Sequence, residues 1–436
     1  MTRADEAKSR TLESGDIRAR LNFLVALGCG LLESGETSGQ TCRTIQASGK
    51  ELGLDQVSVH SFGLLLRVEA EGAGQQASSA TEAANSLDLI DCNRSADLAV
   101  LSRSVLADSR RWKTGEEGRD HLATAEQRIR QLRATTTPWW VIGAGLTMLA
   151  FFISMQVGVT WMAWASAALI QALVFTLGVG IGRLGFPRLF VVIAQSCMAG
   201  AFATLLVQVG FVDPVGSAAA IAVNWLLLLP LPQVIGAVTD AVDADFLSSV
   251  TRLGSVAVAA LGITVGGVFT FSLGEWLGMD HPTLDALPSF PWYLILVFSA
   301  LGAISNAFAN GGRLALVPWP ALLGASAAAV SQLLLHTVGL TPLWATTFAA
   351  AGLGVLSALI AGRTDYPMQV LALMGVTGAL LPGIPVFFGI IREMGGHSGM
   401  QHFGVAVATS LGIGAGVALG AALVRVVQER LLRGPC

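Results

Sequence analysis

The feature that most limits how this chain can fold is a nearly continuous apolar region from Trp139 to Val424. It divides into ten apolar segments, most of which match the ~20 residues that a helix needs to cross a bilayer. The segments cover residues 138–155, 159–182, 187–210, 216–245, 250–274, 291–311, 316–339, 342–361, 367–394 and 401–424. Of all 436 residues, 53% are hydrophobic and only 13% are charged, unlike soluble globular proteins. The sequence therefore predicts a polytopic α-helical membrane protein with ten transmembrane helices.

Two of these segments, 216–245 and 367–394, are longer than one straight span and are interrupted by prolines. The first interruption reads Leu-Pro-Leu-Pro at 229–232, and the second reads Leu-Pro-Gly-Ile-Pro at 381–385. Proline removes a backbone donor and clashes with the preceding turn, so it leaves polar backbone groups that hydrocarbon cannot satisfy. Such groups persist only beside protein or a watery cavity. Paired breaks of this kind therefore indicate the substrate site of a transporter.

The breaks belong to a duplicated unit. Pro-Trp-Trp at 138–140 opens the first segment and Pro-Trp-Tyr at 291–293 opens the sixth, while Pro187 and Pro342 open the third and eighth at nearly the same offset. Each half then has five spans, and an odd number makes the second half enter the membrane from the opposite face. This is an inverted repeat, the architecture of alternating-access carriers. We predict a soluble domain at 1–137 and five-helix repeats at 138–285 and 286–436.

Positive charge predicts the orientation, because cytoplasmic loops collect Lys and Arg. The opposite loops hold mostly acids and a single arginine, Arg392. The arginines on the predicted cytoplasmic side are Arg128, Arg130, Arg133, Arg183, Arg188, Arg252, Arg313, Arg363, Arg425, Arg430 and Arg433. Both termini are predicted to be cytoplasmic. The first twenty residues have no apolar core, so we expect no cleavable signal peptide.

The region before the membrane predicts a small cytoplasmic α+β domain, about 135 residues long and large enough for its own core. Alternating patterns at 56–60 and 64–69 predict two strands with a turn at 61–63, and 72–79 is expected to be a loop. Thr37 or Ser38 is expected to cap the second helix. The predicted helices cover 17–34, 38–52, 82–108 and 116–134.

The two breaks are the candidate substrate site. Half-helices that begin after Pro232 and Pro385 would aim free N–H groups and positive dipole ends at the membrane interior, where a substrate carboxylate fits. The alternative is that both breaks are packing kinks without a ligand. The predicted substrate-binding residues are Asn224, Pro230, Pro232, Gln233, Pro382, Gly383 and Pro385.

Asp240 and Arg252 are the candidate proton-coupling residues. Asp240 follows the first break by eight residues, about 12 Å along a helix, and would accept a substrate ammonium group or carry a proton. Its alternative is an acidic cytoplasmic loop with Asp243 and Asp245. Arg252 is either a cytoplasmic anchor or the partner of Asp240. Uncharged polar residues in the spans either bond across helices or line a path: Gln171, Gln195, Asn224, Asn306, Asn310 and Gln332.

Other functional motifs are missing from the sequence. There is no basic stripe for nucleic acid, and no nucleotide-binding loop, so the energy must come from an ion gradient. His397 and His402 are interpreted as loop residues, so we predict no metal and no cofactor. The five cysteines lack C-x-x-C spacing and are interpreted as free thiols. An enzymatic alternative is a hydrolase-like site in the soluble domain that uses Cys42 and His60, with Asp55 and Asp91 nearby in sequence.

The order of motifs resembles the threonine/serine exporter family of bacteria and fungi. The resemblance is carried by Gly-Glu-Thr-Ser at 35–38 with Arg43, Leu-Gly-Leu at 52–54, the strand pair ending at Arg67, the Pro-Trp-Trp entry, both proline breaks, Asp240 and Arg252. It implies export of small amino acids across a bacterial cytoplasmic membrane, coupled to protons, by antiport. A related two-subunit branch is associated with dicarboxylates, so export of succinate is the alternative. The first break departs from the family's expected Pro-Gly pair. The sequence does not indicate an oligomeric state.

Overall fold

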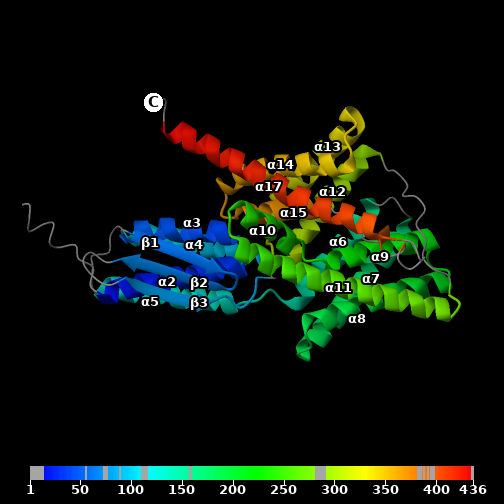
Figure 1. Ribbon diagram of the computed structural model, residues 1–436, viewed down its shortest axis with the longest axis horizontal. Helices are drawn as coiled ribbons and strands as arrows, with labels where there is room; N and C mark the ends of the chain where they lie inside the picture. The colour runs from blue at the N-terminus through cyan, green and yellow to red at the C-terminus, as the bar shows by residue number, and fades with distance from the viewer. Residues whose placement is uncertain are drawn as a thin grey trace, which may run out of the picture. The chain divides into compact units, whose positions relative to one another are not determined.

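The chain is mostly helical, with one small sheet near its N-terminus (Figure 1). The computed structural model describes residues 14–54, 56–71, 77–87, 90–109, 116–156, 160–279, 291–380, 385, 388–389, 392 and 398–433. These residues form two compact units. Unit 1 contains the residues up to Thr136 together with Thr239–Thr251 and Asp365–Pro367, and unit 2 contains Thr137–Val238, Arg252–Thr364 and the residues from Met368 onward.

Unit 1 is built on a three-stranded antiparallel sheet in the order β1-β2-β3. Strand β1 (Gln56–Phe62) pairs with β2 (Leu65–Glu71), which pairs with β3 (Ser78–Ala83). Gly63 makes the first turn with a φ of +65°, a conformation that glycine adopts without strain. Four helices complete the unit: α2 (Ser14–Glu33), α3 (Ser38–Glu51), α4 (Cys92–Ser109) and α5 (Glu116–Ala134).

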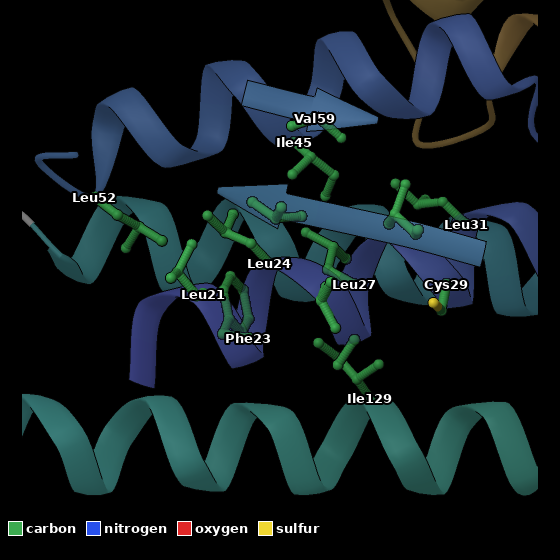
Figure 2. Close-up of a cluster of buried hydrophobic side chains, with 14 of the residues drawn as sticks. Leu21, Phe23, Leu24, Leu27, Cys29, Leu31, Ile45, Leu52, Val59 and Ile129 are labelled. Carbon is green, nitrogen blue, oxygen red and sulfur yellow. The ribbon is translucent and has the colours of Figure 1, made fainter. Parts of the chain in front are cut away.

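The core of unit 1 surrounds helix α2, which is apolar on most of its faces (Figure 2). Leu24 and Leu27 of α2 are fully buried, and they belong to one cluster with Ile45 of α3 and Ile129 of α5. Strand β2 contributes alternate residues, because successive side chains of a strand point to opposite faces. Leu66 and Val68 are buried in this way. The unit therefore has its own hydrophobic core.

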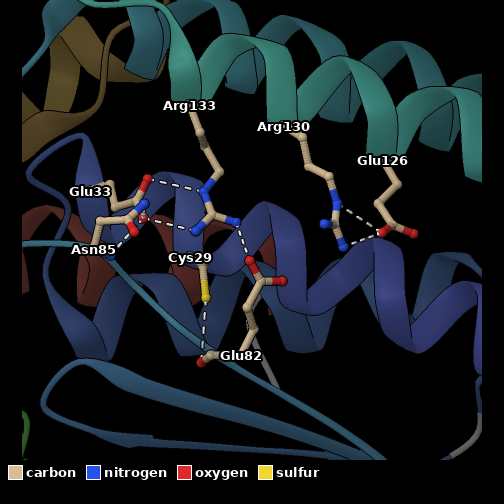
Figure 3. Close-up of polar contacts among 7 residues, drawn as sticks. All are labelled: Cys29, Glu33, Glu82, Asn85, Glu126, Arg130 and Arg133. Carbon is tan, nitrogen blue, oxygen red and sulfur yellow. Dashed lines mark hydrogen bonds and ion pairs between the residues drawn. The ribbon is translucent and has the colours of Figure 1, made fainter.

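A buried ion network joins three elements of unit 1 (Figure 3). The guanidinium of Arg133, near the end of α5, donates to both carboxylate oxygens of Glu33 on α2, at 3.0 and 2.8 Å, and also contacts Glu82 on β3. The backbone N–H and side-chain amide of Asn85 donate to the same Glu33. Arg133 and Glu33 are 9% and 4% exposed. The network ties α5 to α2 and to the sheet.

The structure corrects the prediction for the second half of unit 1. The predicted loop at 72–79 and the start of the predicted helix at 82 overlap strand β3, and helix α4 begins ten residues later, at Cys92. Residues 72–76 lie outside the described part. The predicted strand at 56–60 lies within β1, and the one at 64–69 matches β2 from Leu65 onward. Thr37 is confirmed as the cap of α3, since its hydroxyl accepts from Gln40 N–H at 3.3 Å.

Unit 2 is a helical bundle with a largely apolar surface. Among the described residues, eight helical stretches are long and apolar enough to cross a membrane, and a bent pair makes a ninth. No more than 39% of the most apolar part of each of the eight is buried by protein, so the remainder is left for lipid. The chain is therefore a polytopic membrane protein. The end of α10 and the start of α11 belong to unit 1. The helices after residue 137 are α6 (Trp139–Gln156), α7 (Trp161–Arg183), α8 (Arg188–Gln208), α9 (Pro214–Leu228), α10 (Leu231–Val242), α11 (Phe246–Trp276), α12 (Trp292–Ala309), η2 (Leu314–Leu316), α13 (Pro318–Leu333), η3 (Leu334–Val338), α14 (Pro342–Ala361), α15 (Met368–Ala379) and α17 (Met400–Arg433).

Small residues bring the helices of unit 2 into close contact. Helix α6 packs on α12, where a Cβ built on Gly145 would lie 2.3 Å from the backbone nitrogen of Ala309. Helix α14 packs on α17, where a Cβ on Gly420 would lie 2.1 Å from Ala351 O. Gly416 and Gly420, one turn apart on α17, therefore let α14 and α17 pack closely.

Candidate functional site

The first proline break separates helices α9 and α10, which meet at an angle of 49°. Helix α9 begins with proline at its first position, and Asp213 accepts a hydrogen bond from Gly216 N–H there. It ends before Leu229, whose extended backbone (ψ 128°) directs the chain into Pro230. Helix α10 then starts at Leu231, one residue before Pro232. Both prolines therefore lie at the bend, as the sequence predicts.

The backbone donors at this break are hydrogen-bonded within the break itself. Leu231 N–H donates to Leu229 O at 2.9 Å, and the N–H groups of Gln233 and Val234 both donate to Pro230 O, at 2.9 and 3.3 Å. Pro232 has no N–H to offer. The expectation of free N–H groups at the start of α10 is therefore wrong for these residues. The tight turn through Pro230 places its carbonyl within reach of the donors that were expected to face a substrate.

Buried polar side chains flank the break on both sides. Asn224 of α9 is fully buried, and Gln233 of α10 and Arg252 of α11 are 1% and 2% exposed. Arg252 Nη1 donates to Gln233 Oε1 at 3.2 Å. A Cβ on Gly236, one turn after Gln233, would lie 3.0 Å from the same Nη1, so the guanidinium lies against the start of α10. This arrangement holds a buried cation against the start of α10.

Asn224 joins α9 to α7. Its side-chain nitrogen donates to Ala167 O on α7 at 3.1 Å and to Ala220 O on its own helix at 2.8 Å. Two other polar residues of α7 are Gln171, which the sequence placed among the polar residues of the spans, and Trp164, which sequence reasoning did not consider. Each has a buried polar atom with no hydrogen-bond partner among the described residues. Only the structure identifies these atoms, because their environment depends on how the helices pack.

The second break is described only up to its start. Helix α15 ends at Ala379, and Pro382 and Gly383 lie outside the described residues. Pro385 is described and half-buried. Near the end of α15, Gly378 O accepts a hydrogen bond from the side-chain amide of Gln156 at 2.6 Å. Gln156 lies on α6, so a side chain of the first predicted repeat satisfies a backbone group beside the second break.

Asp240 lies in unit 1, at the N-terminus of helix α3. Its carboxylate is fully buried and accepts hydrogen bonds from Ser38 N–H at 3.0 Å and from the Ser38 hydroxyl at 3.5 Å. The first N–H groups of a helix lack partners within the helix, and its N-terminus favours negative charge. Sequence reasoning identified Asp240 and the cap of α3 separately. It missed their contact because 202 residues separate the two partners.

The neighbouring acids also have structural partners. Asp243 forms an ion pair with Arg43 of α3 at 3.0 Å. Asp245 accepts from Ser248 N–H at 3.1 Å, near the start of α11. The segment with these three acids is therefore bonded to α3 and to the first turn of α11, unlike a solvated loop.

The proposed nucleophile of the enzymatic alternative is poorly suited to attack. Burial and the nearby Asp245 raise the pKa of the Cys42 thiol to about 11, so it is protonated near neutral pH. Burial raises the pKa of Cys29 to about 12 and that of Cys92 further. The four described cysteines form no disulfide. In the described part of the chain, no group of His, Cys, Asp and Glu is arranged to hold a metal.

Comparison with known proteins gives one family. The model of the ThrE family, described as "Putative threonine/serine exporter", matches residues 22–274, more than half of the chain. The match runs from α2 into α11 and includes the first break.

Two curated relatives agree with this family. A "Probable threonine/serine exporter" of Mycobacterium tuberculosis is 29% identical over 303 residues, which cover 65% of this chain and 55% of the relative. The "Threonine/serine exporter" of Corynebacterium glutamicum is 24% identical over 304 residues, which cover 67% of this chain and 60% of the relative. The chain thus spans less than two thirds of either relative. No solved structure matches.

Proposed function

This chain belongs to the threonine/serine exporter family, and from that premise we propose that it is a secondary active exporter of small amino acids, threonine and serine first. The names of its two relatives support this substrate class. We further propose that export is coupled to protons and proceeds by alternating access. The protein would act in the cytoplasmic membrane of a bacterium, with both termini in the cytoplasm.

The observation that carries the proposal is the broken span α9–α10 with its buried polar side chains. A membrane helix that stops and restarts must satisfy polar groups inside the bilayer, and transporters place their substrate sites at such breaks. Asn224, Gln233 and Arg252 are all buried there. We assign substrate binding to these residues and to the region of Pro230 and Pro232. The second break, around Pro382, Gly383 and Pro385, is proposed to complete the site.

The proposed architecture is ten spans in two inverted repeats. The short apolar helix α15 would be the first half of the ninth span, as α9 is the first half of the fourth. The contact between α6 and α12, the first helices of the two halves, supports a pseudo-symmetric arrangement. The bond from Gln156 to Gly378 supports a region shared by the two halves.

Asp240 is proposed to couple proton movement to the state of unit 1. Protonation would remove the negative charge that the N-terminus of α3 stabilises, and would weaken the bonds from Ser38. Because Asp240 lies on the same helix as Pro232, a change in its bonding would be transmitted along α10. Unit 1 would then have a gating role.

Replacing Asp240 with asparagine distinguishes a role in proton coupling from a role in substrate binding. We expect D240N to retain exchange of labelled threonine across proteoliposome membranes and to lose accumulation driven by a pH gradient, because asparagine takes up no proton. D245N is the matched control in the same segment, because asparagine at this position can also cap α11. This variant should keep both threonine exchange and accumulation driven by the pH gradient. Parallel loss of both activities together with a lower melting temperature in D240N would make Asp240 a structural anchor only.

Export of dicarboxylates is the second candidate, favoured by one observation. Arg252 presents a buried guanidinium at the start of α10, and guanidinium groups bind carboxylates with paired hydrogen bonds. A dicarboxylate, however, favours two cationic partners.

Counterflow in proteoliposomes tests the proposed function. Vesicles containing the purified chain and loaded with unlabelled threonine are expected to take up labelled threonine and serine, and empty vesicles are not. Succinate should neither exchange nor compete. Exchange of succinate alone would replace the amino-acid proposal with the dicarboxylate one.

A further inference from the structure

The seam between α7 and α9 contains two buried amide oxygens that lack hydrogen-bond donors. Asn224 Oδ1 and Gln171 Oε1 have no hydrogen-bond partner in the described part of the structure. Asn224 is fully buried, and Gln171 is 3% exposed. The orientation of the Asn224 amide follows from its contacts, because the carbonyls of Ala167 and Ala220 can accept only from its nitrogen. Its oxygen must therefore face away from both.

The two oxygens belong to the same seam. Asn224 reaches α7 at Ala167, and Gln171 lies one turn further along α7, about 6 Å in axial rise. Ala167, Ile170 and Val174 of α7 form one apolar cluster with α9 residues such as Ile221. Unpaired acceptors in such surroundings are destabilising, so a ligand with several N–H donors is favoured there.

A third polar group lies on the same face of α7. Trp164 is seven residues before Gln171, two helical turns, and its buried Nε1–H also lacks an acceptor among the described residues. Its ring is held by Phe151 and Phe298, at centroid distances of 6.2 and 6.5 Å. Helix α7 therefore carries a buried donor, Trp164 Nε1–H, two turns before the buried acceptor Gln171 Oε1.

We propose that this seam binds the amino-acid zwitterion, an inference that rests on the proposed function. Gln171 Oε1 and Asn224 Oδ1 accept from the primary ammonium group, and Trp164 Nε1–H donates to the carboxylate. Neutral amide oxygens suit a carrier, because they orient the ammonium without an ion pair that would slow its release. A bare metal cation fits less well, since it needs about six oxygen ligands and the nearest carbonyls already accept from Asn224.

The test compares threonine with 3-hydroxybutyrate, which is threonine without its amino group, as competitors of labelled threonine counterflow. Wild type should be inhibited by threonine and not by 3-hydroxybutyrate. Gln171→Met keeps the length of the side chain and removes the acceptor. In this variant we expect the KM for threonine to rise about tenfold, and the preference for threonine over 3-hydroxybutyrate as a competitor to fall by the same factor. Gln171→Glu keeps an acceptor oxygen and should keep the preference.

The control is Gln195→Met, on helix α8 where α8 packs against α7. The Gln195 amide donates to Val174 O at 3.0 Å, so this variant loses a hydrogen bond between helices. The unpaired oxygens of Asn224 and Gln171 are left unchanged. Its preference for the amine should equal that of wild type. An unchanged preference in folded Gln171→Met would overturn the site and leave the exporter standing, with water as the partner of the amides. A wild type that exchanges no amino acid would overturn both.

Discussion

Replacing Arg133 with methionine is expected to lower the free energy of unfolding of unit 1 by about 3 to 5 kcal/mol, the usual effect of removing one partner of a buried ion pair. Methionine would leave Glu33 buried and facing Glu82 without a cation between them (Figure 3). For a unit of this size the loss corresponds to a fall in melting temperature of about 10 to 20 °C. Thermal unfolding of the purified full chain, followed by circular dichroism, measures this fall.

Arg130 provides the matched control on the same helix. It pairs with Glu126 at 2.8 Å, but its side chain is 64% exposed, and such surface pairs add little. R130M should therefore change stability by less than about 1 kcal/mol. Equal melting temperatures for R133M and wild type would show that the buried network does not hold α5 in place.

The same network gives unit 1 a defined pH dependence. Burial by itself raises the pKa of Glu33, but the hydrogen bonds from Arg133 and Asn85 outweigh it and the pKa is lowered overall. A carboxylate with a lowered pKa stabilises the fold above its unfolded value, about 4.3, and loses that contribution as the pH falls below it. Wild type should accordingly lose more stability than R133M between about pH 5 and pH 3.

The helices could be predicted from the sequence because their signals are local. The length of the apolar segments and the prolines at their ends give the bounds of α6–α9 to within a few residues. Strand β3 could not be predicted, because Ser-Ser-Ala-Thr-Glu-Ala contains few residues of high strand propensity. It forms because β2 offers it an unpaired edge.

The candidate site could be predicted only in part. The chemistry of proline indicates the break at Pro230, but the pairing of Gln233 N–H with Pro230 O depends on backbone angles that residue types do not fix. Two further features arise from tertiary packing: the contact of Asp240 with Ser38, and the absence of a hydrogen-bond donor near Gln171 Oε1 among the described residues. These features mark the limit of prediction from a single sequence.

Straightening the first break is expected to abolish transport without harming the fold. In the double variant P230A/P232A, helices α9 and α10 can join, because both positions regain an N–H and lose the ring that clashes with the preceding turn. Alanine is favoured over proline by about 3 kcal/mol in a helix interior, so the variant should melt no lower than wild type. P342A is the matched control, since Pro342 occupies the first turn of α14, where proline interrupts no hydrogen bond.

The rate of threonine counterflow per folded molecule, measured for P230A/P232A, P342A and wild type, therefore tests the central claim that substrate passes at the break. We predict a rate near background for the double variant and a wild-type rate for P342A. A wild-type rate in folded P230A/P232A would contradict the claim and move the substrate path away from α9 and α10.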